Sequence, residues 1–95
     1  MIELSTSNEI IQLLIQKIET KRKKAKITQK NLAKKAGVSY GSYREFIDNN
    51  SISLYSFISL LHVLGLFDEL KVLVDNAQVK TIAQMKAEDK LSGRV

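Results

Sequence analysis

Side chains suited to contact with nucleic acid are concentrated in the first half of the chain. Residues 1–47 hold ten Lys or Arg against four Asp or Glu, whereas residues 48–95 hold five against six, so the two halves carry net charges of +6 and −1. A localised cationic region is typical of proteins that displace counterions from a polyanion. Arg44 adds more specific chemistry, because a guanidinium can form a bidentate pair with guanine, and Tyr40 and Glu45 supply further donors and acceptors.

Two short helices joined by a tight turn are predicted to position these side chains. Thr28 is suited to cap a helix that begins at Gln29, and Gly37 stands where a helix end favours a residue that tolerates positive φ. Ser39 is suited to cap a second helix that begins at Tyr40. The basic run just before this unit, residues 21–26, also fits a solvated helix end that complements the macrodipole.

The spacing of apolar residues predicts which sides of these two helices face the core. The inward positions are Leu32, Ala33 and Ala36 on the first helix, and Tyr43, Phe46 and Ile47 on the second. The opposite side of the second helix then presents Tyr40, Gly41, Arg44 and Glu45. Small residues at the crossing allow close approach, which is the geometry of a helix-turn-helix unit that reads DNA. An ordinary helical hairpin without a nucleic-acid role is the alternative.

The rest of the chain predicts three more helices and therefore an all-α fold, a compact five-helix bundle. Thr6 and Glu9 have the spacing of a capping box before a helix over about residues 7–24, whose apolar stripe comprises Ile10, Ile11, Leu14, Ile15 and Ile18. Ser53 is suited to cap a helix that ends at Gly65, with a predicted core stripe of Leu54, Phe57, Ile58, Leu61 and Leu64. Residues 66–74 predict a short fifth helix.

We divide the chain into a helical DNA-binding domain, residues 1–75, and a C-terminal arm or tail, residues 76–95. The apolar period weakens after Asp75, so this second segment could be a sixth helix, an arm exchanged with another subunit or a tail. The chain lacks cysteine and has no apolar run of membrane-spanning length, which predicts a cytoplasmic protein without disulfides or membrane contact, nucleoid-associated when bound to DNA.

Enzymatic chemistry finds little support in the sequence. The single histidine, His62, has no cysteine or second histidine to act with, and the acidic pair Asp68-Glu69 is better explained as charge at a helix N-terminus. We therefore predict no catalytic residue, no metal site and no cofactor.

The residue order from Thr28 to Leu73 resembles the Cro/C1-type (XRE) helix-turn-helix family of bacterial and phage regulators, which fold as a compact five-helix domain. Three segments are similar to its HipB-like antitoxin and repressor branch: Gly37-Val38-Ser39-Tyr40-Gly41-Ser42 followed by Phe46, Ile52-Ser53-Leu54, and Leu64-Gly65-Leu66-Phe67-Asp68-Glu69-Leu70. The resemblance implies a homodimer that binds an inverted-repeat operator at its own promoter and holds a HipA-type Ser/Thr kinase toxin.

The resemblance also implies roles for individual residues. Base edges would be read by Tyr40, Gly41, Arg44 and Glu45, and phosphates would be contacted by Lys26, Thr28, Gln29, Lys30, Ser39, Ser42, Asn49 and Asn50. The chain departs from the family pattern at Ile47, where members often carry Glu, and near Asn49 or Asn50, where they often carry Gly. The first departure predicts that an acid–base tether to the first helix is missing.

Three alternative functions and the location of the dimer interface remain open from the sequence. The chain could be a phage-type or stand-alone XRE regulator without a toxin partner, a protein-interaction module that has lost DNA binding, or a nonspecific architectural DNA binder. For the dimer, two groups of apolar residues are predicted as interface: Ile10, Ile11, Leu13 and Ile15 near the start, or Val79, Ile82 and Met85 near the end.

Overall fold

The computed structural model describes residues 6–75 together with Ile82, Met85 and Lys86. Within the described residues the chain is all-helical, with five helices in the order α1 (Ser7–Lys24), α2 (Gln29–Ala36), α3 (Tyr40–Asn49), α4 (Leu54–Val63) and α5 (Phe67–Asp75). Ile82, Met85 and Lys86 are also helical. The predictions for the remainder of segment 76–95 lie outside the described residues. No described helix combines the length and apolar character needed to cross a bilayer.

Four helices begin directly after the residue predicted to cap them. Thr6 and Glu9 form the reciprocal capping box at the start of α1. The side chains of Thr28, Ser39 and Ser53 each accept a hydrogen bond from the backbone N–H three residues further on. These bonds satisfy N–H groups that have no partner inside the helix, so the starts are fixed locally by sequence.

Residues with left-handed backbone lie in the turns before and after α2. Gly37 closes α2 with a φ of 72°, as predicted. The turn after α1 instead uses Lys26, with a φ of 60°. A side chain with a Cβ is disfavoured in this conformation by roughly 1–2 kcal/mol, so Lys26 occupies a position better suited to glycine.

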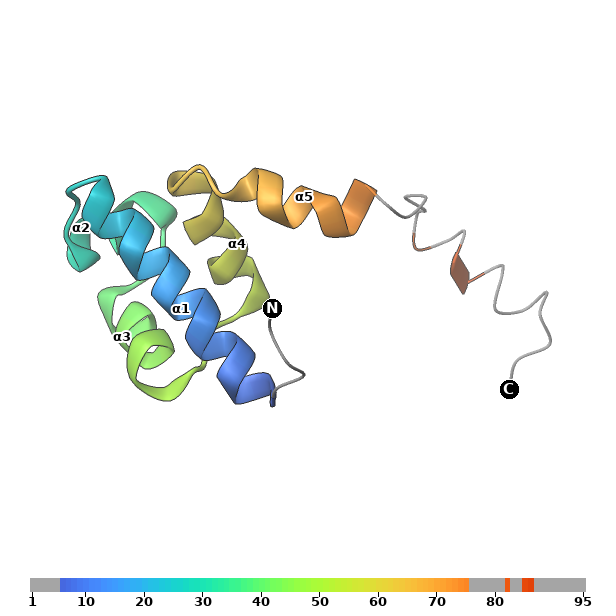
Figure 1. Cartoon of the computed structure of the whole chain (residues 1–95), viewed down its shortest axis with the longest axis horizontal. Helices are drawn as coiled ribbons and strands as arrows, with labels where there is room; N and C mark the ends of the chain where they lie inside the picture. The colour runs from blue at the N-terminus through green and yellow to red at the C-terminus, as the bar shows by residue number, and fades with distance from the viewer. Residues whose placement is uncertain (1–5, 76–81, 83–84, 87–95) are drawn as a thin grey trace.

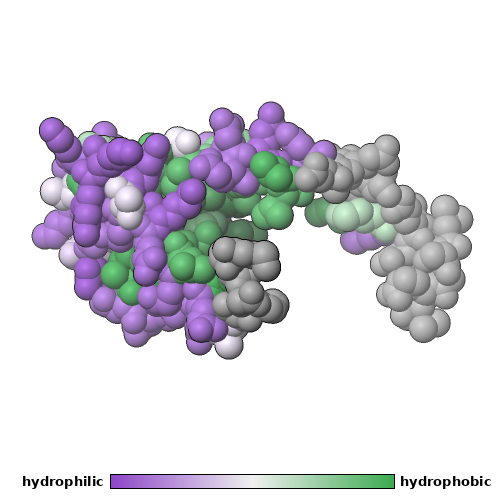
Figure 2. Space-filling view, viewed as in Figure 1, coloured by the Kyte–Doolittle hydropathy of each residue, from purple (hydrophilic) through white to green (hydrophobic). Residues whose placement is uncertain are grey.

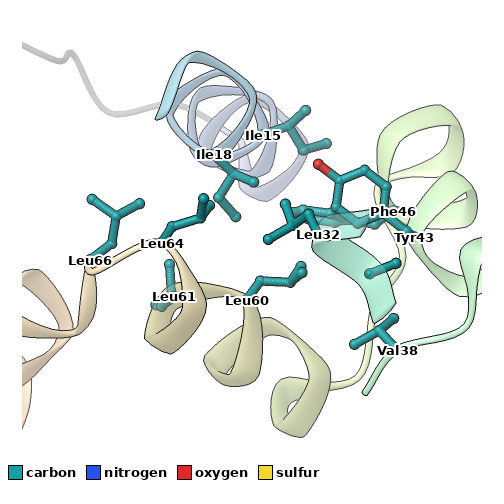
Figure 3. Close-up of a cluster of buried hydrophobic side chains, with 11 residues drawn as sticks. Ile15, Ile18, Leu32, Val38, Tyr43, Phe46, Leu60, Leu61, Leu64 and Leu66 are labelled. Carbon is teal, nitrogen blue, oxygen red and sulfur yellow. The ribbon is translucent and has the colours of Figure 1, made fainter. Parts of the chain in front are cut away.

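The core lies where α1 crosses the bundle formed by α2, α3 and α4 (Figure 1). Figure 3 shows Ile15 and Ile18 of α1 meeting Leu32 of α2 and the aromatic rings of α3. The buried set comprises Ile15, Ile18, Leu32, Ala33, Val38, Tyr43, Phe46, Leu60, Leu61, Leu64 and Leu66. The helix α5 packs against α4 but contributes no buried residue of its own.

The predicted core stripe of α4 is partly wrong. Leu54 is 71% exposed, and Leu60, which lies outside the predicted stripe, is completely buried. The line that faces the core runs through Phe57, Leu60 and Leu61 to Leu64 beyond the helix end. Because α4 carries apolar residues on several sides, its sequence does not define which side faces inward.

The apolar stripe of α1 divides into a core half and an exposed half. Ile15 and Ile18 are buried, and Ile11 packs partly buried against the core. The prediction that Ile15 is left over for a dimer interface is therefore wrong, because the core already uses it. Ile10, Leu13 and Leu14 do remain exposed, each at 37–41%.

Candidate nucleic-acid interface

The turn between α2 and α3 is filled from inside by Val38. Its side chain is buried, and its backbone N–H donates to the carbonyl of Ala33 at 2.9 Å. Ala33 is itself 1% exposed, and α2 and α3 are in contact.

The outer face of α3 carries the four residues predicted to read bases. Tyr43 and Phe46 point into the core, whereas Tyr40, Gly41 and Glu45 are exposed and Arg44 is half-exposed. A Cβ added at Gly41 would meet no atom within 4 Å, so packing inside this chain does not demand glycine there. The predicted division of α3 into an inner and an outer side is confirmed.

Lys30 and Tyr40 connect the first turns of α2 and α3. The Lys30 ammonium lies 5.3 Å from the centroid of the Tyr40 ring. A cation–π contact of this exposure contributes about 0.5–1 kcal/mol. A predicted phosphate contact and a predicted base contact thus share one small surface.

Arg44 is held by two side chains, one from α2 and one from α3. Its Nη1 donates to Oε1 of Gln29 at 2.9 Å, and its Nη2 donates to Oδ1 of Asp48 at 2.8 Å. The other end of the Gln29 amide donates to Glu19 of α1 at 3.2 Å. Both polar atoms of the Gln29 side chain, which was predicted to contact a phosphate, are therefore hydrogen-bonded within the protein. Gln29 thereby links Arg44 to α1.

Glu19 is the centre of this polar network. Arg22 donates to its two carboxylate oxygens at 3.0 Å and 2.8 Å, and the Tyr43 hydroxyl donates to it as well. Burial opposes ionisation of Glu19, but these hydrogen bonds, that of Gln29 and the charge of Arg22 together lower its pKa to about 2. Burial, followed by the bond to Glu19, raises the pKa of Tyr43.

Among the described residues no acid–base pair joins α1 to α2 or α3, as predicted, but hydrogen bonds of Tyr43 and Gln29 to Glu19 form a different tether. Ile47 indeed cannot supply an acid, but Tyr43 reaches Glu19 from α3, and Arg22 also donates to the backbone carbonyl of Ile27 at 2.7 Å. Sequence reasoning missed Glu19. The available signal was an acid next to the buried Ile18 and three residues before Arg22, at a spacing that favours an ion pair.

The serines and asparagines predicted to contact phosphates fall into two groups. Ser39 and Ser42 are exposed, and the Ser39 hydroxyl donates to the Ser42 oxygen at 2.9 Å. Asn49 is exposed and donates to the Glu45 carboxylate. Asn50 instead faces α1, where it accepts from Gln12 and approaches Asn8 at 3.4 Å. The structure therefore separates Asn50 from the others.

Exposed lysines are numerous on the elements that precede α3, although Lys21 and Lys24 line a hollow together with Leu66 and Glu69. They lie at the end of α1, in the following turn and on α2, and comprise Lys21, Lys23, Lys24, Lys26, Lys30, Lys34 and Lys35. Figure 2 shows hydrophilic side chains covering the end of the molecule where α2 and α3 lie. The surface thus combines Lys30, next to Tyr40, with one arginine held in a defined place.

His62 lies away from this surface. It is exposed at the end of α4 and stacks on Phe67, with ring centroids 4.3 Å apart and planes 18° apart. Among the described residues, no group of three or more His, Cys, Asp or Glu is placed to hold a metal ion.

No protein-family model, curated protein or solved structure matches this chain. The described geometry supports an all-helical fold of five helices, and the assignment of a function rests on the residues and surfaces themselves.

Proposed function

We propose that this chain is a sequence-specific DNA-binding transcriptional repressor in which α2 and α3 form the helix-turn-helix unit. The observation that carries the proposal is the outer face of α3, where Tyr40, Arg44 and Glu45 are accessible while Glu19 and Gln29 brace the helix from behind. A rigid helix with varied donors and acceptors, surrounded by lysines, matches what major-groove reading requires.

The chemistry divides between specific and nonspecific contacts. Arg44 would donate both guanidinium nitrogens to O6 and N7 of a guanine, exchanging its bonds to Gln29 and Asp48 for bonds to the base. Lys30 and the lysines around it would neutralise phosphates and release counterions. The first kind of contact selects a sequence, and the second strengthens binding to any duplex.

Two copies of the chain would bind one inverted repeat. One reading helix covers only a few base pairs, and half-sites about 34–36 Å apart let two subunits bind together. The resemblance to the HipB-like branch of the Cro/C1-type (XRE) family supports the finer proposal that the operator is the chain's own promoter and that a HipA-type kinase toxin is a partner in the cytoplasm.

A salt titration on selected DNA tests the central proposal. An operator is first selected from random duplexes, and binding to it and to a scrambled duplex is then followed by fluorescence anisotropy. We expect the operator to bind more tightly, with log affinity for both falling at about −0.9 per phosphate neutralised. Equal affinity for the two duplexes would favour a nonspecific architectural binder and overturn the repressor proposal.

Three variants assign the roles of the side chains. Arg44→Ala is expected to lose about 1–3 kcal/mol on the operator and to relax the preference at one base position. Lys30→Ala should weaken the operator and the scrambled duplex alike. Lys71→Ala, on α5, removes the same charge outside the candidate interface and serves as the control. Equal losses from Lys30→Ala and Lys71→Ala would mean that only net charge matters.

A protein-interaction module that has lost DNA binding is the second candidate. Exposed apolar residues on α5, including Val72 and Leu73, favour it, because such side chains suit protein contact more than DNA contact. Co-expression with a HipA-like kinase tests it. A stable complex combined with no operator preference in the titration would support this candidate over the repressor.

A further inference from the structure

One face of α1 points away from the side of this helix that holds α2 and α3. Its residues are exposed, and we call them the outer face of α1: Leu13, Gln16, Lys17, Thr20, Lys21 and Lys24. At about 3.6 residues per turn, the three lysines lie roughly 140–200° around the helix axis from Glu19. The Glu19 carboxylate accepts hydrogen bonds from α2 and α3. The outer face therefore lies on the opposite side of α1 from the candidate nucleic-acid interface.

A hollow of about 480 Å³ lies between the outer face and the start of α5, where Leu66 and Glu69 complete its lining. Leu66 is 5% exposed, whereas Leu13 is 41% exposed and offers an accessible apolar side chain. Leu13, Lys17, Thr20 and Lys24 recur at intervals of four, three and four residues, the spacing that keeps contacts along one side of a helix. The short Thr20 side chain near the middle of this line lets a second helix approach closely.

Positive charge dominates this hollow. Its lining holds three lysines against one glutamate. Lys17 pairs with Glu69, with Nζ and Oε2 3.7 Å apart, but both side chains are more than half exposed, so this pair is weak and can exchange partners. Lys21 and Lys24 form no ion pair with any residue that the structure describes. The outer face is therefore complementary to an acidic surface.

Three other occupants suit the outer face less well. A second copy of the face would set lysines against lysines, and like charges in contact disfavour pairing. The phosphates of a DNA duplex would offer Leu13 no apolar partner and would meet the carboxylate of Glu69. A small anion would stay largely in solvent, because Leu66 alone among the lining residues is not exposed, whereas ligand pockets enclose most of their ligand.

We propose that the outer face of α1 is the docking surface for an acidic helix of a partner protein. The helix would lie along α1 with carboxylates against Lys17, Lys21 and Lys24 and an apolar side chain against Leu13. In an antiparallel helix, Glu at i, i+3 and i+7 and Leu at i+11 reproduce the spacing of these four residues. The inference goes beyond the proposed repressor and does not depend on it.

A designed peptide tests the surface with the full chain. The probe is a capped, fluorescently labelled helix of about 18 residues, based on alanine and glutamine, with Glu at i, i+3 and i+7 and Leu at i+11. A peptide of the same composition, with its Glu residues distributed around the helix, is the control. In fluorescence anisotropy at low salt we expect the control to bind about 10-fold more weakly, as the loss of three exposed ion pairs implies. Equal affinities would overturn the proposal.

Charge reversals locate the bound peptide on the chain. Lys21→Glu should weaken the designed peptide about 10-fold, and a peptide with Lys at i+3 should regain the affinity, because attraction is restored at the same contact. Lys35→Glu on α2 is the matched control, since Lys35 is exposed and does not line the hollow. It should change the affinity less than about 2-fold. Circular dichroism verifies that both variants are folded. Equal losses from the two variants, or no recovery with the exchanged peptide, would contradict the assignment.

Competition with DNA separates this inference from the proposed function. We expect the selected operator duplex to join the complex of chain and peptide, and sedimentation should show all three components together. Displacement of the peptide by the duplex would assign the outer face to DNA and overturn the inference. A chain that binds the designed peptide but shows no operator preference would uphold the inference and overturn the repressor alone.

Discussion

The surface side chains around α3 differ from those along α5 in how they are bonded. Around α3, polar groups are bound to one another, from Glu19 through Gln29 to Arg44 and Asp48. Along α5, Phe67 stacks on His62 and Leu70 packs against the core, but Val72, Leu73 and Val74 remain exposed. The first region is organised before any ligand arrives, because its bonds are internal. The second leaves apolar side chains exposed.

The largest expected contrast is between truncations of a buried and an exposed apolar side chain, one on α3 and one on α5. Phe46 is 1% exposed and packs edge-on against Tyr43 and Phe57, with ring centroids 6.4 Å and 6.1 Å away. Phe46→Ala should lower the free energy of unfolding by about 3–5 kcal/mol. Leu73→Ala should change it by less than about 0.5 kcal/mol in the monomer. Urea unfolding of dilute protein measures both, and similar losses would contradict the contrast.

A second expected effect concerns the acid stability of the polar network. The pKa of Glu19 is lowered from 4.5 to about 2 in the folded chain. Ionised Glu19 therefore contributes stability that is fully present above about pH 4.5 and is lost as the pH falls toward 2. Glu19→Gln should cost on the order of 2–3 kcal/mol at pH 7, and this difference should shrink through that window.

Urea unfolding of the wild type and of Glu19→Gln at a series of pH values measures this effect. Tyr43→Phe is a useful companion variant, because it keeps the buried ring and removes one of the hydrogen bonds to Glu19. We expect it to cost about 1 kcal/mol and to keep most of the acid dependence. A constant difference between the wild type and Glu19→Gln from pH 7 to about 2 would mean that Glu19 is not held as described.

The smallest expected effect compares two left-handed residues. Lys26 and Asn50 have φ values of 60° and 58°. Lys26→Gly should stabilise the chain by about 0.5–1 kcal/mol, because the relief of strain exceeds the entropy cost of glycine. Asn50→Gly should be neutral or destabilising, since it removes the contacts with Asn8 and Gln12. Thermal unfolding of both variants checks the order, and a destabilising Lys26→Gly would show that the turn is not strained.

Helix boundaries could be predicted from the sequence because caps act locally. Thr28, Ser39 and Gly37 act within a few residues of where they stand, so short-range rules sufficed. The side of α4 that faces the core could not be predicted, because burial of Leu60 depends on neighbouring helices rather than on α4 itself.

The residue types of the candidate site could be predicted from the sequence, but the hydrogen bonds that join these residues across helices could not. The pair of Arg44 with Asp48 is local, four residues apart on one helix, and could have been expected. The bonds that join Glu19, Gln29 and Arg44 bring three helices together, and no spacing within one helix encodes them. The exposed face of α5 was not predicted, because the sequence analysis gave residues 66–74 only as a short fifth helix.

The hydrogen bonds of Arg44 to Gln29 and Asp48 affect how strongly the proposed repressor would discriminate against a wrong base. In the proposed function, a guanine competes with Gln29 and Asp48 for the same guanidinium nitrogens. At an unsuitable base pair, Arg44 would keep its hydrogen bonds to these two residues and would not lack acceptors. The difference in binding free energy between a suitable and an unsuitable base at that position would therefore be smaller. The protein would tolerate degenerate operators there, and Asp48→Ala, which removes one of these two acceptors, would make its choice of base stricter.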